Sequence, residues 1–232
     1  MKKRGSHVGI ILSFVVFVLF VSFLYIAFKP NIKVQQNKEL ALEYLEKELI
    51  KLSTEKLCIA TIHIIGSYNP QITCFNISHP NNFGTYNYAL VKEGENNLIG
   101  SSKSTNLEFD ISENQDFFKI YYSNVTLNPA TLTEEDCEPA VKDTNYSIGL
   151  ISTKEYIFES KLLALFENVT AQKNIGELIN NEFNFGFTYF NGTTIWLNEI
   201  KELSTNIYVK KIPIQYVDEE ANIKFGYLNI II

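Results

Sequence analysis

The sequence predicts an α+β protein: a single N-terminal transmembrane helix, a short amphipathic helix, then a β-rich antiparallel extracytoplasmic head. The first observation behind this prediction is an uncharged apolar run over Val8–Phe28. The second is a stripe of leucines at helical spacing that follows the run. The third is a change of period after Lys56, where short apolar segments alternate with turns rich in Gly, Asn and Ser.

These observations divide the 232 residues into four predicted segments. They are a cytoplasmic basic segment over 1–7, the transmembrane helix over 8–28, a linker and amphipathic helix over 29–55, and the β-rich α+β domain over 56–232. The last segment is read either as one continuous domain or as two with a boundary near residue 145.

The apolar run is long enough to cross a bilayer. Its 21 residues span about 30 Å as a helix, the thickness of the hydrocarbon core. Lys2, Lys3 and Arg4 precede it, which places the N-terminus in the cytoplasm and the rest of the chain outside. A cleaved secretory signal would have a shorter apolar region and a small-residue cleavage site, and this sequence has neither. The sequence therefore predicts a retained single-pass anchor in the cell membrane, with the lipid bilayer as a partner.

The residues just before the run, Lys3-Arg4-Gly5-Ser6, suggest a more specific interpretation. Basic residues and a glycine directly before a long apolar helix resemble the class III signal of archaeal type IV pilin precursors. Bacterial pilins also carry a Glu five residues after the cut, whereas this chain has Ile10 there, so the archaeal type is the closer match. The resemblance covers residues 2–28 and implies cleavage between Gly5 and Ser6, assembly of the apolar helix into a filament core, and a β head. The alternative is an ordinary signal anchor in which Gly5 is incidental.

Pro30 follows the apolar run and is expected to break or kink the helix. Residues 31–36 are then predicted to be a linker, and Asn37 to cap an amphipathic helix over Lys38–Leu52. The leucine stripe of this helix is expected to pack on the head's own sheet; the alternative is a stalk that packs on neighbouring copies. The stripe consists of Leu42, Leu45, Leu49 and Leu52.

Strands are predicted wherever short β-rich segments lie between turn residues. A first hairpin is expected around residues 66–70, and an exposed loop over 124–145. In the second half, Ser160 is expected to cap a helix running to Phe166, and Ala171–Asn181 to form another helical stretch. Asn191-Gly192 is a favoured two-residue hairpin turn. The predicted strands are Lys56–Ile65, Gln71–Ile77, Thr85–Lys92, Leu107–Ile111, Phe117–Tyr122, Ser147–Phe158, Phe183–Phe190, Thr193–Leu197, Ile207–Val217 and Ile223–Ile232, the last two as a hairpin that pairs the C-terminus.

The three cysteines suggest an oxidised head. Cys58 and Cys74 are each eight residues from Gly66, so they would face each other across the first hairpin, and Cys137 would be left over. The sequence allows three pairings, or buried free thiols, and does not choose among them. Cys58–Cys74 is the candidate disulfide that the hairpin suggests.

Five Asn-x-Ser/Thr motifs lie beyond the apolar run, on the predicted outer side. The composition alone gives about three such motifs by chance, so their number is weak evidence for glycosylation. Asn124 and Asn145, in the predicted loop, are the best acceptors. The five candidates are Asn76, Asn124, Asn145, Asn168 and Asn191.

Nothing in the sequence predicts an enzyme, a cofactor or a metal site. There is no phosphate loop, dinucleotide fingerprint, nucleophile elbow or zinc motif, and the three histidines have no ligand partners at short spacing. The acidic clusters 134–138 and 218–220 lack the alternating pattern of calcium loops and are interpreted as solvated loops. The formal net charge is −6, with a single arginine, which argues against a nucleic-acid partner.

We therefore predict the function from the expected location of the protein, anchored in the membrane with its head outside. We expect a membrane-anchored structural or adhesive surface protein, pilin-like at its N-terminus, whose partners are the bilayer and copies of itself or other pilin-like subunits. The alternative is a monomeric signal-anchored module that binds a sugar, a peptide or a membrane-complex partner. An extracellular hydrolase, which would need converging carboxylates or His63 and His79 in one pocket, ranks last.

Overall fold

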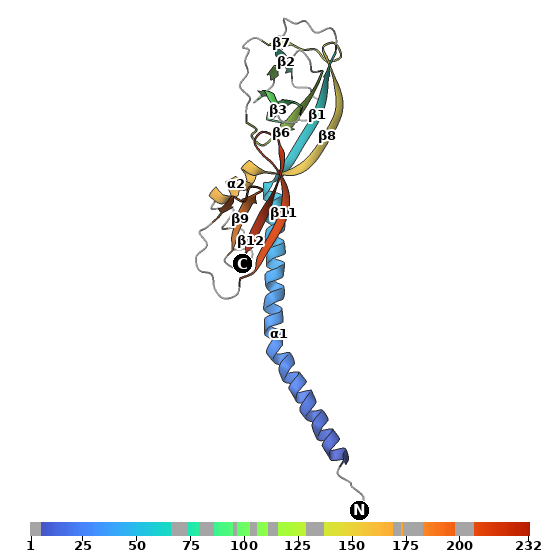
Figure 1. Ribbon diagram of the computed structural model, residues 1–232, viewed down its shortest axis with the longest axis vertical. Helices are drawn as coiled ribbons and strands as arrows, with labels where there is room; N and C mark the ends of the chain where they lie inside the picture. The colour runs from blue at the N-terminus through green and yellow to red at the C-terminus, as the bar shows by residue number, and fades with distance from the viewer. Residues whose placement is uncertain are drawn as a thin grey trace, which may run out of the picture.

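The computed structural model shows one long helix that carries a β-rich head at its C-terminal end (Figure 1). The structure describes residues 6–65, 74–78, 86–94, 97–102, 106–110, 116–128, 137–168, 173, 183–197 and 207–232, and every structural statement below concerns these. The helices are α1 (Ser6–Ser53) and α2 (Glu159–Glu167). The strands are β1 (Thr54–Ile64), β2 (Cys74–Ser78), β3 (Tyr88–Glu93), β4 (Asn97–Ser102), β5 (Asn106–Asp110), β6 (Phe117–Ser123), β7 (Glu138–Pro139), β8 (Tyr146–Phe158), β9 (Asn184–Tyr189), β10 (Thr194–Trp196), β11 (Val209–Val217) and β12 (Ile223–Ile231). The predicted α+β class with one apolar N-terminal helix is confirmed.

Helix α1 runs without interruption from Ser6 to Ser53. The predicted linker over 31–36 and the separate helix starting at Asn37 are therefore wrong. Pro30 is the one proline in this stretch, and it removes a single backbone donor without ending the helix. Figure 1 shows α1 bent part-way along its length, which is the usual effect of a proline inside a helix.

The end of α1 is fixed by hydroxyl side chains. The Ser53 Oγ donates to the Leu49 carbonyl at 2.7 Å, and the Thr54 Oγ1 donates to the Ile50 carbonyl at 2.7 Å. Both hydroxyls therefore bond back to backbone carbonyls four residues earlier, at the last turn of the helix. Strand β1 starts at the next residue, Thr54, so the helix leads into the sheet without a loop.

The strands form a single 12-stranded sheet in the order β10-β9-β12-β11-β8-β1-β6-β3-β4-β5-β2-β7. Most pairs are antiparallel, as predicted, but β8–β11 and β2–β7 are parallel. The predicted hairpin of β1 with β2 is wrong: β1 pairs with β6 and β8, and β2 pairs with β5 and β7. The alternating pattern identifies a strand but not its neighbour, which here comes from distant sequence. The turn predicted at 66–70 lies outside the described residues.

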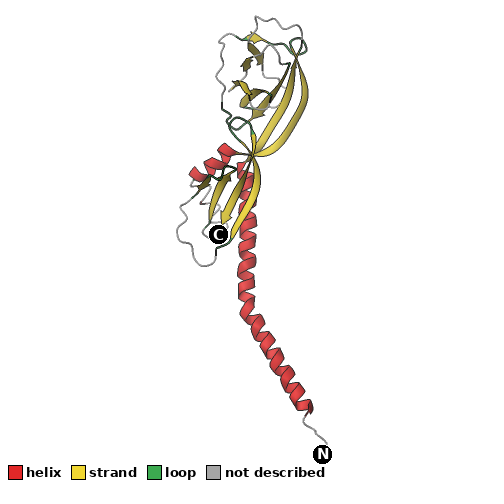
Figure 2. Cartoon of the chain, viewed as in Figure 1, coloured by secondary structure: helices red, strands yellow, loops and turns green. Residues whose placement is uncertain are grey.

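The head has two halves. We call β1–β8 the distal half, and α2 with β9–β12 and residues 38–53 of α1 the proximal half (Figure 2). The sheet connects them through the parallel pairs Tyr216–Ile157 and Val217–Phe158. Because β8 starts at Tyr146 and pairs along β1, the sheet runs continuously across the alternative boundary near residue 145.

The proximal core is built by helices against strands. Leu45 and Leu49 of α1 are fully buried, and they pack with Leu162 of α2 and with Phe185 and Leu228 of the sheet. The predicted packing of the leucine stripe on the head's own sheet is therefore confirmed. Lys210 of β11 also forms an ion pair with Glu46 of α1 at 2.5 Å.

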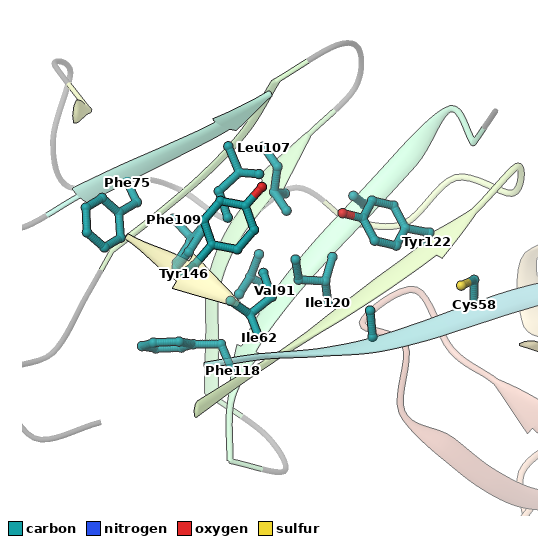
Figure 3. Packing of buried hydrophobic residues seen from close by; sticks show 13 residues of the cluster. Cys58, Ile62, Phe75, Val91, Leu107, Phe109, Phe118, Ile120, Tyr122 and Tyr146 are labelled. Atoms are coloured by element: carbon teal, nitrogen blue, oxygen red, sulfur yellow. The ribbon is translucent and has the colours of Figure 1, made fainter. Parts of the chain in front are cut away.

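The distal core draws on alternate residues of β1, β2, β3, β5 and β6, so this part of the sheet curls around a single cluster (Figure 3). The period of two puts these side chains on one face. The opposite face of β1, β3 and β6 supplies Leu57, Leu90 and Tyr121, which pack with Phe158 and Val217 where the two halves meet. We call this second set the joint cluster.

Local predictions in the second half hold with small shifts. The β9–β10 and β11–β12 hairpins are both present. Gly192 has φ +88°, and the Asn191 Oδ1 accepts a hydrogen bond from the Thr193 N–H at 3.0 Å. Because the Tyr189 N–H donates to the Thr193 carbonyl, the turn also includes Phe190, and the predicted two-residue turn is one residue too short. The C-terminal strand β12 pairs with β11, as expected, and also with β9, which was not predicted.

Two details in the helices and strands differ from expectation. Helix α2 begins at Glu159 with Phe158 as its N-cap residue, and no side chain caps it, so the predicted Ser160 cap is wrong. Strand β4 was not expected, because its Gly and Ser residues lack a strand pattern. Of the helical stretch predicted over 171–181, the structure describes only Lys173, which is helical.

Leu45→Ala tests the packing of α1 on the head. We expect the free energy of unfolding to fall by about 2–5 kcal/mol, because the substitution leaves a cavity where Leu45 is fully buried. Leu40→Ala is the matched control on the same helix, since Leu40 is 65% exposed, and it should change stability by less than about 0.5 kcal/mol. The measurement is denaturant unfolding of the full chain in detergent, followed by fluorescence of the single tryptophan, Trp196. Equal effects of the two substitutions would contradict the packing.

Candidate functional site

The first candidate site is the N-terminal part of α1. His7–Ile26 is a 20-residue segment with a mean hydropathy of 2.8, none of it buried by the rest of the protein. By length and composition it can cross a membrane, and among the described residues it is the one helical segment that can. A signal sequence near an N-terminus shares these properties.

The apolar side chains of His7–Ile26 are exposed, and such a surface is normally covered by lipid or by protein. Large side chains such as Phe14, Leu19 and Phe23 are each more than 60% exposed, and they are distributed around the helix. An apolar surface of this extent is not stable in water and marks contact with lipid or protein. The second half of the same helix is instead buried in the head through Leu45 and Leu49. Helix α1 thus joins an uncovered apolar segment to a folded domain without a break in the helix.

The predicted processing junction lies at the start of α1. Ser6 is the first residue of the helix, while Gly5 and the basic segment before it lie outside the described residues. The cleavage between Gly5 and Ser6 stays a prediction.

The predicted Cys58–Cys74 disulfide is wrong. Cys74 is bonded to Cys137, and Cys58 is a buried free thiol on β1. The reason is the strand order: β6, β3, β4 and β5 lie between β1 and β2 in the sheet. Figure 3 shows Cys58 at one end of the distal core and Phe75, the neighbour of Cys74, at the other. Cys137 instead leads into β7, which pairs directly with β2.

The five glycosylation candidates occupy different environments. Asn124, Asn168 and Asn191 are exposed, at the end of β6, the end of α2 and the β9–β10 turn. Asn76 is half-buried, and its Nδ2 donates to the Glu108 Oε1 at 2.9 Å, which occupies the atom that a glycan would use. The amide of Asn145 is also engaged, since its Oδ1 accepts from the Val141 N–H at 2.9 Å. Glycosylation stays a prediction at all five positions.

The described residues contain no group of three or more His, Cys, Asp or Glu side chains that could hold a metal ion. His63 lies on β1 with its ring stacked on Phe117 at 4.6 Å between centroids, which fits a packing role. His79 and the acidic residues 134–136 lie outside the described part of the chain.

A polar cluster that the sequence did not reveal lies beside the joint cluster. Lys92 of β3 is only 1% exposed, and its Nζ donates to the Asn222 Oδ1 at 2.5 Å. The Asn222 Nδ2 donates to the Asp218 Oδ2 at 3.1 Å, and the Lys224 Nζ lies 2.6 Å from the same carboxylate oxygen. We call these four residues the Lys92 cluster. The solvated-loop interpretation of 218–220 is therefore wrong for Asp218, which is 7% exposed.

Two sequence signals could have indicated this cluster. One is a lysine directly after the apolar run Tyr88–Val91 of β3, where an uncompensated charge would be costly to bury. The other is the Asp218-x-x-x-Asn222 spacing. Asp218 closes the β11–β12 turn by accepting from the N–H groups of Glu220 and Asn222 at 3.0 and 2.7 Å.

Lys92 and Asp218 both have pKa values below their usual ones. Burial lowers the pKa of Lys92, and the nearby carboxylates of Asp218 and Glu220 only partly oppose this effect. Burial tends to raise the pKa of Asp218, but the hydrogen bonds from Lys224 and Asn222 outweigh it and hold that pKa below its usual value. Asp218 is thus a carboxylate at neutral pH, beside a lysine whose charge is disfavoured.

A shallow groove of about 480 Å³ lies where α1 meets β1. Most of the residues that line it are charged, although the apolar parts of these side chains supply most of the lining surface. It is lined by Glu46, Lys47, Ile50, Lys51, Thr54, Glu55, Lys56 and Glu155. Lys161 of α2 donates to the Thr54 carbonyl at 2.9 Å and to the Glu55 carboxylate at 3.2 Å beside it, which ties α2 to the start of β1.

Comparison with models of known protein families, with curated proteins and with solved structures finds no match to this chain.

The arrangement of the cysteines predicts a labelling pattern. Native protein should leave Cys58 unmodified by an alkylating reagent, because this thiol is only 1% exposed. Denaturation without reductant should expose one reactive thiol, and denaturation with reductant all three. Peptide mapping assigns the labels. A Cys58–Cys74 linked peptide in the unreduced digest would contradict the structure.

Proposed function

We propose that this chain is a membrane-anchored structural or adhesive protein of the cell surface, with the N-terminus of a pilin-like subunit. In this proposal, His7–Ile26 holds the chain in the bilayer, and the head lies outside the cell. Cleavage between Gly5 and Ser6 would release the apolar helix to pack with copies of itself or of other pilin-like subunits.

The observation that carries the proposal is the division of α1. One continuous helix has an uncovered apolar segment at its N-terminal end and a leucine stripe buried in the head at its C-terminal end. A subunit whose helix packs against either lipid or neighbouring helices needs both an uncovered apolar segment and a buried attachment to its head. A rigid connection to the head then fixes the head relative to the membrane or to the filament axis.

Two further observations support the proposal. The basic residues lie before α1, and the head beyond it carries an excess of acidic residues, which agrees with a cytoplasmic N-terminus. The Cys74–Cys137 disulfide suits an oxidising compartment on the outer side.

Gly5→Val tests the processing step. We expect the unaltered protein, purified from its host membranes, to begin at Ser6, and the Gly5→Val protein to keep its basic segment and to be absent from material sheared off the cell surface. N-terminal sequencing and intact mass measure the first outcome, and electron microscopy of the sheared fraction measures the second.

Gly9→Ala is the matched control. Gly9 is also in this region, but a Cβ added there meets nothing within 4 Å, so processing should be unchanged. A mature N-terminus at Met1 or Lys2, with a monomeric protein in detergent, would contradict the proposal and favour a signal-anchored binding module. Cleavage beyond Phe28 would contradict it too, because the apolar run would then be a secretory signal.

A further inference from the structure

The Lys92 cluster brings together a buried amine and a side-chain amide from opposite halves of the head. Lys92 lies on β3 in the distal half, whereas Asn222 lies in the β11–β12 turn of the proximal half, 130 residues further along the chain. The Lys92 Nζ also lies 5.2 Å from the centroid of the Tyr121 ring, and the Asn222 Nδ2 donates to the Asp218 carboxylate. Because burying a lysine costs free energy, we expect this contact to have a structural or chemical role.

The amine lies within reach of the amide carbon. Its Nζ is 2.5 Å from the Asn222 Oδ1, and a C=O bond adds only about 1.2 Å, so the Nζ can be no farther than about 3.7 Å from the Cγ. Reacting atoms in near-attack arrangements are about 3–3.5 Å apart. A small rotation of either side chain therefore suffices to move the amine from the oxygen to the carbon.

The surroundings favour the nucleophilic form of the amine. Lys92 is 1% exposed, and burial disfavours its ammonium form, so a larger share of neutral amine is present than in water. Asp218 accepts a hydrogen bond from the Asn222 Nδ2, the atom that would leave, at 3.1 Å. The carboxylate is therefore in contact with the reacting amide and in position to carry a proton to it.

We propose that Lys92 and Asn222 form an intramolecular isopeptide bond, with Asp218 as the catalytic group that transfers the proton. The proposal concerns the head alone and does not depend on filament assembly.

The reaction balances without any other reagent. The lone pair of the neutral Lys92 Nζ forms a bond to the Asn222 Cγ, and the carbonyl π electrons move to Oδ1. When they return, the Cγ–Nδ2 bond breaks. The Asp218 carboxylate takes a proton from the Nζ and delivers it to Nδ2, which leaves as ammonia. The product is a secondary amide between the two side chains, and the carboxylate is regenerated.

The bond would reinforce the connection between the two halves of the head. Between the two halves, the sheet is continuous through only two residue pairs, Tyr216–Ile157 and Val217–Phe158. A covalent link from β3 to the β11–β12 turn would hold the halves together beside this connection, on the side of the joint cluster.

Mass spectrometry of the full chain, purified in detergent and reduced, tests the proposal. We expect an intact mass lower than that calculated from the observed N-terminus by the mass of one ammonia molecule. A protease digest should contain a branched peptide joined through Lys92 and Asn222, in place of the two separate peptides. A full mass, with Lys92 recovered as an unlinked peptide that accepts amine-reactive label after denaturation, would overturn the proposal.

Variants then assign the roles. Lys92→Met and Asn222→Ala should each abolish the mass deficit and the branched peptide, and Asp218→Ala should reduce both strongly by removing the proton carrier. Lys119→Met is the matched control, because Lys119 pairs with Lys92 across β3 and β6 but is exposed, and it should retain the deficit. Persistence of the deficit in Lys92→Met would overturn the assignment. The first measurement uses the unaltered chain, so it does not depend on whether any variant folds.

Discussion

The pairing of β1 with β8 is the interaction on which the rest of the structure depends. The two strands pair at ten positions. Each strand is joined directly to a helix: α1 leads into β1, and β8 leads into α2. On the other side of β1 lies β6, which starts the curl of the distal half, and the end of β8 carries β11 and the proximal half. The position of α1 relative to both halves is therefore set by one long ladder of backbone hydrogen bonds.

The two halves of the head bury their apolar side chains in different ways. The proximal half buries a sheet face under two helices, which places α1 in its core. The distal half buries side chains inside its own curled sheet and is closed by the Cys74–Cys137 disulfide at its far edge. In the region between them, the polar residues Asp218, Asn222 and Lys92 accompany the joint cluster. Directional contacts at this place fix an orientation that apolar packing alone would leave less well specified.

The sequence predicted most of the elements and few of their partners. The apolar run, the leucine stripe and the two last hairpins follow from short-range periodicity, and they are present. The β1–β2 hairpin and the Cys58–Cys74 pair failed together, because both assumed that neighbours in sequence are neighbours in the sheet. The burial of Lys92 and Asp218 also could not be predicted, since it arises only when segments 130 residues apart come together. Pro30 was overestimated as a helix stop: a proline costs one hydrogen bond, which long helical flanks can tolerate.

The central position of β12 has a consequence for biosynthesis. This strand lies between β9 and β11 and packs against α1, so the earliest and latest parts of the described chain share one core. The proximal half cannot close until the residues up to Ile231 have been made. Contacts this distant in sequence form slowly, whereas the local hydrogen bonds of a helix form fast. Helix α1 can therefore form well before the proximal half is complete, and its leucine stripe stays uncovered until the last strands arrive.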